Sequence, residues 1–315
     1  MVLRLLKNRD FLLSLGLVLG IFANDLARFT QDLALPTLAV VMTLSTLGVS
    51  KAQFQNPQKL LRAALWGIAL NYLLLSSLIL AMSRIFEYDR PLYDGFVILA
   101  AVPPAVAVIP FTDFLDGDRA FSLLATMGAY LGALFIMPVL AAAHWQTDFI
   151  SPFALLKIVL LLIVLPVAAA QALRLIGLSR RIEPVKGAIT NWCFFLVTYT
   201  IVGLNSEFIR QAPGALFPVM AAAFFSTFGL GVAITLTGRI LRVPRQRLQS
   251  MVLLGTLKNY GLAGGLALAL FSQKTALPAV VSTTFMVVYI IWLGFLKRRT
   301  SDSQRPGPKP PEPRQ

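Results

Sequence analysis

Ten apolar blocks separated by polar segments constrain the fold of this chain more than any other feature. The blocks cover residues 11–29, 33–49, 62–85, 95–115, 119–143, 152–174, 187–206, 215–239, 247–272 and 275–296. Most are close to the roughly 20 residues that a helix needs to cross ~30 Å of hydrocarbon. Because backbone N–H and C=O groups cannot stay unpaired in lipid, and because continuous apolar runs lack the alternation of a membrane β-barrel, we expect an all-α membrane protein with ten transmembrane helices.

The positive charges of the chain indicate its orientation. Charged residues make up only 13% of the sequence, yet the net charge is +14, from 28 Lys and Arg against 14 Asp and Glu. Of the 28 positive residues, 21 lie on the side of the membrane that also holds both termini, and five lie on the other side. This bias is the positive-inside rule, so we expect a multi-pass protein of the cell (inner) membrane with both termini cytoplasmic. The basic residues are thereby explained by the lipid bilayer, and nucleic acid is not expected as a partner.

The two ends of the chain differ from the rest. Arg4, Lys7 and Arg9 precede the first apolar block, a pattern that also fits a cleaved signal peptide. No clear small-x-small site follows, so an uncleaved first span is the expectation. Residues 297–315 are polar and rich in proline, which predicts a disordered cytoplasmic tail.

Ten spans divide into two sets of five, residues 1–150 and 151–296. A repeat with an odd number of spans must enter the membrane in opposite directions in its two copies, as in many secondary transporters. Spans 4–5 and spans 9–10 each combine an interrupted span with a very short turn. We therefore predict two inverted five-helix repeats.

Helix-breaking residues lie at matching places in the two halves. Pro103, Pro104 and Pro110 are expected to break span 4, and Gly255 and Gly261 to loosen span 9. Non-helical backbone within the membrane survives only inside protein or along a cavity, where freed carbonyls and helix ends can form an ion or substrate site. The alternative is a pair of ordinary packing kinks.

Lys258 is the most unusual polar residue. It lies about eleven residues past Arg247, or roughly 16 Å into the membrane along a helix, where a charge costs at least ~3 kcal/mol. Such a residue either has a function or is paired with an acid. Asp113 is the best acidic candidate, although it could instead cap a half-helix or lie at the membrane interface.

No enzyme constellation is present in the sequence. The chain has one histidine, His144, which we expect in an outer loop, and one cysteine, Cys193. There is no Gly-rich phosphate loop, no HExxH and no Ser-His-Asp set to complete. We therefore expect neither an enzyme, nor a metal site, nor a cofactor.

Two segments, PPAVAVIPFTDFLDGDRAFSLLAT and GTLKNYGLAGGLALAL, resemble the bile acid:sodium symporter (BASS) family, and the similarity extends over most of the chain. The positions that match the family's motifs are Pro103, Gly117, Asp118, Asn259 and Gly261. The resemblance implies ten helices in a panel and a core domain, crossed broken helices 4 and 9, and alternating access for organic anions.

The chain departs from the family at the sodium ligands. In sodium-coupled members a Ser-Asn pair stands where this chain has Val108 and Ile109, a Glu where it has Leu254, and a Gln where it has Lys258. The resemblance keeps the hydroxyls of Ser122 and Thr126 and places Asn71 about where a span-3 Gln contributes. Because a sodium ion needs several oxygen ligands, these replacements predict that the sodium site is lost.

These departures lead to a hypothesis about the mechanism. The Lys258 ammonium takes the role that sodium has elsewhere, and Ser122, Thr126, Asn259 or Asn71 accept its hydrogen bonds. The candidate substrate and coupling residues are Lys258, Asn259, Asp113, Thr112, Asn71, Ser122 and Thr126. The expected partner is a small organic anion. Transport would be sodium-independent, and either facilitated or coupled to protons, unless the ammonium faces a substrate carboxylate directly.

Three other functions stay open from the sequence. A cation/proton exchanger of related crossed-helix architecture would use Lys258 and Asp113 as its proton-exchanging pair. A sodium-coupled organic anion symporter would follow the family more closely. A membrane receptor or scaffold would bind its ligand without moving it.

Overall fold

The computed structural model describes residues 8–47, 56–85, 89–105, 107–145, 161, 164–204, 206–207 and 216–302. Within these ranges the chain is helical, with short irregular connections and one isolated bridge between extended residues. Among the described residues, five stretches are long and apolar enough to cross a membrane: Pro57–Ile85, Arg119–Trp145, Ser179–Leu204, Phe217–Ile240 and Lys274–Lys297. The prediction of an all-helical, multi-pass membrane protein is therefore confirmed.

Within the described part of its first half, the chain forms ten helical elements. They are α2 (Arg9–Phe22), α3 (Ala27–Thr30), η1 (Gln31–Leu33), α4 (Ala34–Thr46), α5 (Pro57–Ile68), the π-helix η3 (Ala69–Ser76), α6 (Ser77–Ile85), α7 (Arg90–Ala101), α8 (Val108–Phe114) and α9 (Arg119–Trp145). Local sequence explains two of the starts. Asn56 and Asp89 accept hydrogen bonds from backbone N–H groups in the first turns of α5 and α7, and each is followed by a proline within two residues.

The second half contains α11 (Leu165–Leu175), α12 (Ser179–Leu204), α14 (Phe217–Phe224), the π-helix η5 (Phe225–Gly229), α15 (Leu230–Ile240), α16 (Arg245–Thr256), α17 (Tyr260–Leu270) and α18 (Gln273–Asp302). One boundary was predicted wrongly. Helix α18 continues to Asp302, so the predicted tail is helical over residues 297–302. Arg4, Lys7 and residues 303–315 of the tail lie outside the described residues.

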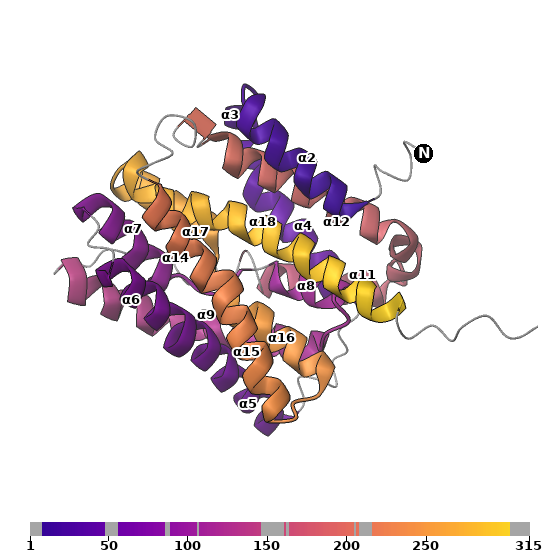
Figure 1. Ribbon diagram of the computed structural model, residues 1–315. Helices are drawn as coiled ribbons and strands as arrows, with labels where there is room; N and C mark the ends of the chain where they lie inside the picture. Colours follow the sequence, from indigo (N-terminus) through magenta and orange to yellow (C-terminus); the bar gives the residue numbers. More distant parts are fainter. Residues whose placement is uncertain are drawn as a thin grey trace, which may run out of the picture.

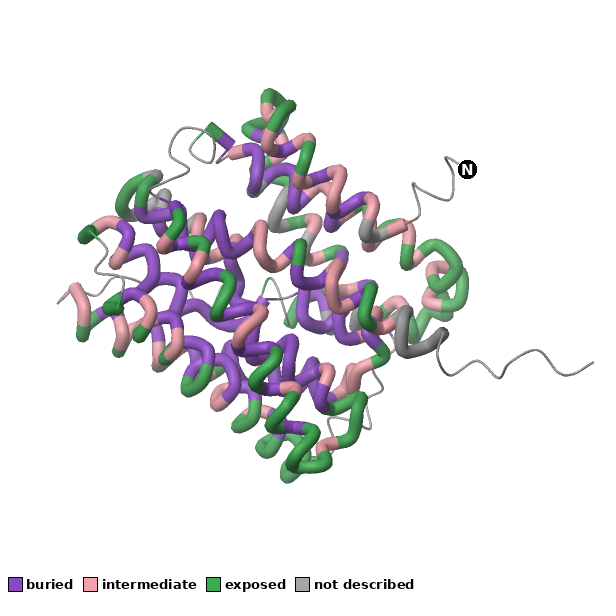
Figure 2. The backbone as a smooth tube through the Cα atoms, in the orientation of Figure 1, coloured by how far each residue is buried: buried purple, intermediate pink, exposed green. Residues whose placement is uncertain are grey.

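The helices pack in two groups. Helix α12 lies against α2 and α4, and α4 also contacts α11; these helices run along one side of the molecule (Figure 1). The second group contains α5 to α9 and α14 to α18, and α18 packs on both α7 and α17. Figure 2 shows the buried stretches concentrated in the interior, with exposed stretches around the periphery. Large apolar side chains on that periphery, such as Phe29, Phe135 and Ile240, are what a lipid-facing surface requires.

Small residues allow α5 and α9 to approach each other closely. A Cβ atom on Gly67 would lie 2.0 Å from the backbone oxygen of Ala125, and one on Gly128 would lie 2.2 Å from the Cβ of Ala64. Membrane helices lack a hydrophobic driving force for association, so small residues that permit close backbone contact stabilise such pairs. This contact fixes α5 next to α9.

Candidate functional site

Two interrupted helices cross at the centre of the second group. Helix α7 ends at Ala101 and α8 begins at Val108, while α16 ends at Thr256 and α17 begins at Tyr260. The two interruptions pass each other in antiparallel fashion. Asn259 N–H donates to Pro103 O at 2.8 Å, and Ala105 N–H donates to Leu257 O at 3.3 Å. Each break therefore supplies hydrogen-bond partners to backbone groups of the other break. Non-helical backbone inside a membrane requires such partners, because lipid offers none.

Proline and asparagine explain where the helices stop and restart. Val102 is extended (φ −65°, ψ 151°), as expected of a residue that precedes a proline, and Pro103 and Pro104 follow it. At the other interruption, the Asn259 side chain accepts a hydrogen bond from Leu262 N–H at 3.0 Å and caps α17.

Three residues expected at the breaks lie inside helices instead. Pro110 is in the first turn of α8, where the absence of an N–H costs nothing. Gly255 precedes the last residue of α16, and Gly261 is the second residue of α17. The interruption in span 9 thus lies between the two glycines.

The Lys258 side chain is fully buried, with 0% of its surface exposed, and its ammonium lies in a cage of oxygens. The nitrogen donates to Asn71 Oδ1 at 2.8 Å, Ser76 Oγ at 2.8 Å, Ala100 O at 2.9 Å and Val102 O at 2.8 Å. An ammonium has three N–H donors, so four acceptors satisfy it completely. Two of these acceptors are carbonyls at the carboxyl end of α7, the negative end of that helix dipole.

An aromatic ring covers the same charge. The Lys258 nitrogen lies 4.4 Å from the centroid of the buried Tyr72 ring, within the range of a cation–π contact. The ammonium therefore has no room for a substrate carboxylate. The four oxygens of the cage already accept hydrogen bonds from the Lys258 nitrogen, so the cage has no space for a sodium ion.

Asn71 joins the cage to the end of α16. Its Nδ2 donates to Leu254 O at 3.1 Å and to Leu257 O at 3.2 Å, while its Oδ1 accepts from Lys258. The last carbonyls of a helix have no N–H partner within the helix, and Asn71 supplies the missing donors. The prediction that Asn71 accepts a hydrogen bond from Lys258 is confirmed.

Ser76 and the carbonyls of Ala100 and Val102 were not predicted as partners of Lys258. In an α-helix, residues five positions apart lie about 140° apart around the axis, so Asn71 and Ser76 would face different neighbours. The segment is a π-helix, whose i to i+5 pattern places both side chains on one face. The sequence carries no hydrophobic period that signals this change.

The other predicted acceptors do not contact the ammonium. The hydroxyls of Thr112 and Ser122 are 2.8 Å apart, and Asn259 Nδ2 donates to Tyr130 Oη at 2.9 Å. The Thr126 hydroxyl is buried without a hydrogen-bond partner among the described residues. Ser122, Thr126 and Asn259 make no hydrogen bond to Lys258, so of the four candidate acceptors Asn71 is the one that contacts the ammonium.

Two aliphatic residues occupy the start of α8. Val108 and Ile109 are both fully buried, at the place where the family resemblance puts polar sodium ligands. Their side chains offer no oxygen to a cation. The residues present therefore do not reproduce that ligand set.

Asp113 pairs with other cations than Lys258. It lies at the end of α8, forms an ion pair with Arg119, and lies 3.7 Å from the Lys186 nitrogen on α12. Asp118, after the following turn, lies 3.2 Å from Arg247. The acidic residues of this turn thus tie α8 to its neighbours, and the postulated Lys258–Asp113 pair is not formed.

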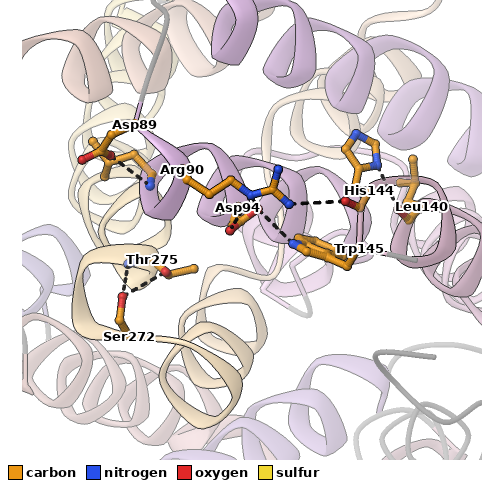
Figure 3. Close-up of polar contacts among 9 residues, drawn as sticks. Asp89, Arg90, Asp94, Leu140, His144, Trp145, Ser272 and Thr275 are labelled. Atoms are coloured by element: carbon orange, nitrogen blue, oxygen red, sulfur yellow. Dashed lines mark hydrogen bonds and ion pairs between the residues drawn. The ribbon is translucent and has the colours of Figure 1, made fainter. Parts of the chain in front are cut away.

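A second polar network joins the start of α7 to the end of α9, away from the crossing (Figure 3). Asp94 accepts hydrogen bonds from Trp145 Nε1 at 2.9 Å and from Arg90 Nε at 3.3 Å. Arg90 also donates to His144 O at 3.4 Å. His144 is in the last turn of α9, not in a loop as expected, and among the described residues no group of three potential ligands could hold a metal. The network fastens the end of α9 to the start of α7.

A small cavity of about 60 Å³ lies beside the crossing. It is lined by residues of α2, α12 and α18 together with the crossing itself, among them Leu13, Phe194, Thr198, Asn259 and Met286. Such a volume holds a few water molecules, whereas small-molecule sites measure roughly 300–1,000 Å³. The cavity lies between the two helix groups, next to the crossing.

The comparisons with known proteins give one family. A model described as the Sodium Bile acid symporter family matches residues 35–212, which is more than half of the chain. No curated protein matches the chain. The matched range contains the first helix break, Asn71, Ser122 and Thr126, and it ends before Lys258. The chain belongs to the sodium bile acid symporter family and is a membrane transporter.

Proposed function

We propose that this protein is a secondary carrier of an organic anion that does not use sodium, because the Lys258 ammonium permanently takes the place of the cation. The observation that carries the proposal is the cage of four oxygens at 2.8–2.9 Å around that nitrogen. A carboxyl end of a broken helix is a typical ligand for a coupling cation. Here an amine tethered to the opposite broken helix occupies it.

A tethered cation changes what the site can do. A sodium ion binds from one side of the membrane and leaves on the other, so its gradient drives transport. Lys258 cannot leave the protein, so it carries no ion across the membrane except a proton that it releases and regains. Transport is then facilitated by the anion's own gradient, or driven by protons if the amine releases and regains one.

The organic anion binds beside the crossing, in the cavity between α2, α12 and the two breaks. Helix α17 begins there, and a helix N-terminus favours an anion. Since the cavity is far too small for such a molecule, α2 and α12 must move away from the crossing to admit it. This separation of two helix groups is the motion that alternating access needs.

The proposal includes ten spans in two inverted repeats, residues 1–150 and 151–296, in the inner membrane with both termini cytoplasmic. Two features support the repeats. Each half has an interrupted helix at the crossing, and each has a π-helix in an earlier span, Ala69–Ser76 and Phe225–Gly229. The exchanger alternative has less support, because Asp113 pairs with Arg119.

Uptake by the purified protein in liposomes tests the proposal. A thermal-shift screen of organic acids first identifies an anion that stabilises the protein, and its uptake is then compared in sodium and in choline buffers of equal ionic strength. We expect equal uptake in the two buffers. Uptake at least tenfold faster in sodium would establish the sodium-coupled alternative and contradict the proposal.

The variant Lys258→Gln shows whether the ammonium is responsible. It removes the charge and leaves acceptors of the cage without donors, so we expect uptake to fall by about tenfold or more. Lys59→Gln is the matched control, because Lys59 is exposed at the start of α5. Unchanged uptake by Lys258→Gln, with no new dependence on an ion, would contradict the proposal.

A further inference from the structure

A larger cavity, of about 650 Å³, lies between α15, α16 and α18. It shares no lining residue with the small cavity beside the crossing. Its volume is within the range of small-molecule sites. Neither the family match nor the proposed transport cycle gives this cavity an occupant.

One end of this cavity is strongly basic. Arg239 at the end of α15, Arg245 at the start of α16 and Lys297 on α18 line it, and its lining contains no Asp or Glu. Lys297 also forms an ion pair with Asp116, at 2.6 Å. The two arginines flank the short turn between α15 and α16, and both are exposed. This end of the cavity therefore suits the negatively charged part of a ligand.

The rest of the cavity is apolar and opens through apolar side chains. Val232, Leu236 and Leu296 line it while 45%, 53% and 38% exposed, respectively. In a membrane-spanning chain, exposed apolar residues of this kind contact acyl chains. The opening therefore faces lipid, and the ligand best suited to enter has an acyl chain.

The inner wall carries two polar atoms that need partners. Tyr289 Oη and Gln249 Oε1 are buried and have no hydrogen-bond partner among the described residues, and both residues line the cavity. A buried polar atom without a partner is destabilising, so a ligand whose ester or hydroxyl group hydrogen-bonds to these atoms binds more favourably.

We propose that this cavity binds an anionic phospholipid of the surrounding bilayer, with one acyl chain between α15 and α18 and the phosphate between Arg239 and Arg245. Basic pockets between membrane helices on the cytoplasmic side are suited to such headgroups, and the positive charges place this end of the molecule on that side. The lipid also lies against α16, the half-helix that ends beside Lys258. Its occupancy therefore stabilises the half-helix that positions the ammonium.

Lipid binding to the purified full-length protein tests this site independently of transport. Native mass spectrometry measures the affinity for phosphatidylglycerol, for phosphatidylcholine with the same acyl chains, and for water-soluble glycerol phosphate. We expect phosphatidylglycerol to bind most tightly. Glycerol phosphate binding as tightly would show a soluble-anion site and overturn the proposal.

Charge and cavity variants locate the binding. Arg239→Gln combined with Arg245→Gln is expected to weaken phosphatidylglycerol binding about 30-fold. Each basic residue near an anionic lipid contributes about fivefold to the affinity, and the two contributions multiply. The control combines Arg180→Gln with Arg181→Gln, which removes the same charge from an exposed site on α12. Equal loss in the control would show nonspecific attraction and overturn the proposal.

Leu236→Trp narrows the mouth without changing charge. Because Leu236 is exposed, the variant is expected to keep the thermal midpoint of the lipid-free protein. It is also expected to lose the preference for phosphatidylglycerol over glycerol phosphate. Wild-type lipid binding by this variant would place the lipid elsewhere on the protein.

Discussion

The ammonium nitrogen of Lys258 lies 2.8 Å from the side-chain oxygen of Asn71, a residue 187 positions earlier in the chain. The same asparagine donates to two carbonyls at the end of α16, so it binds both the charge and the helix that delivers it. The two residues come from the two halves of the chain. A buried charge at the crossing thereby depends on a π-helical segment of the first half.

Asn71 and Ser76 are expected to differ in their importance. Asn71→Leu removes one acceptor of the ammonium and both donors to the Leu254 and Leu257 carbonyls, so we expect it to lower the free energy of unfolding by about 2–4 kcal/mol. Ser76→Ala leaves three acceptors for three N–H groups, and we expect a loss of about 1 kcal/mol. Chemical unfolding in detergent measures both. A larger loss for Ser76→Ala than for Asn71→Leu would show that Ser76 contributes more to stability than Asn71, and would contradict this expectation.

The sequence predicted the apolar helices, the break at Pro103 and Pro104, and the burial of Lys258, because each depends on local residue types and membrane depth. It did not predict which side chains meet Lys258. Ser76 became a partner through a π-helix that has no sequence period, and Ala100 and Val102 contribute backbone atoms that no side chain reveals. The sequence left three positions open for Asp113, and the pairing with Lys258 is not formed, because pairing across a crossing depends on helix directions, which residue types alone do not give.

Asp113→Asn distinguishes a carrier from a proton exchanger. Asp113 pairs with Arg119 at a partly exposed position, where an ion pair contributes at most about 1 kcal/mol. We therefore expect uptake of the organic anion to change less than about fivefold. Loss of transport in this variant, with intact folding by circular dichroism, would support the Lys258–Asp113 exchange mechanism instead.

The contact between α5 and α9 is expected to be sensitive to a single methyl group. Gly67→Ala places a Cβ within 2.0 Å of a backbone oxygen that cannot move freely, so we expect a loss of about 1–3 kcal/mol in unfolding free energy. Gly187→Ala is the matched control, because a Cβ there has no atom within 4 Å. That control is expected to be stabilised by up to about 1 kcal/mol through helix propensity. Equal thermal midpoints for the two variants would contradict this account of the packing.

The network at the far end of α7 depends on an acceptor more than on a charge. Asp94→Leu leaves the Trp145 N–H and Arg90 without this partner, and we expect a loss of about 2 kcal/mol. Asp94→Asn keeps an oxygen of similar position, and since Arg90 is well exposed we expect about 1 kcal/mol at most. Urea unfolding of the two variants checks this order, and the reverse order would show that the ion pair dominates.

Binding of radioactive sodium to the purified protein tests the central claim most directly. If the Lys258 ammonium holds the place of the cation, the wild-type protein binds no sodium above the background measured with an excess of unlabelled sodium, with or without a stabilising organic anion. Saturable sodium binding by the wild-type protein would contradict that claim.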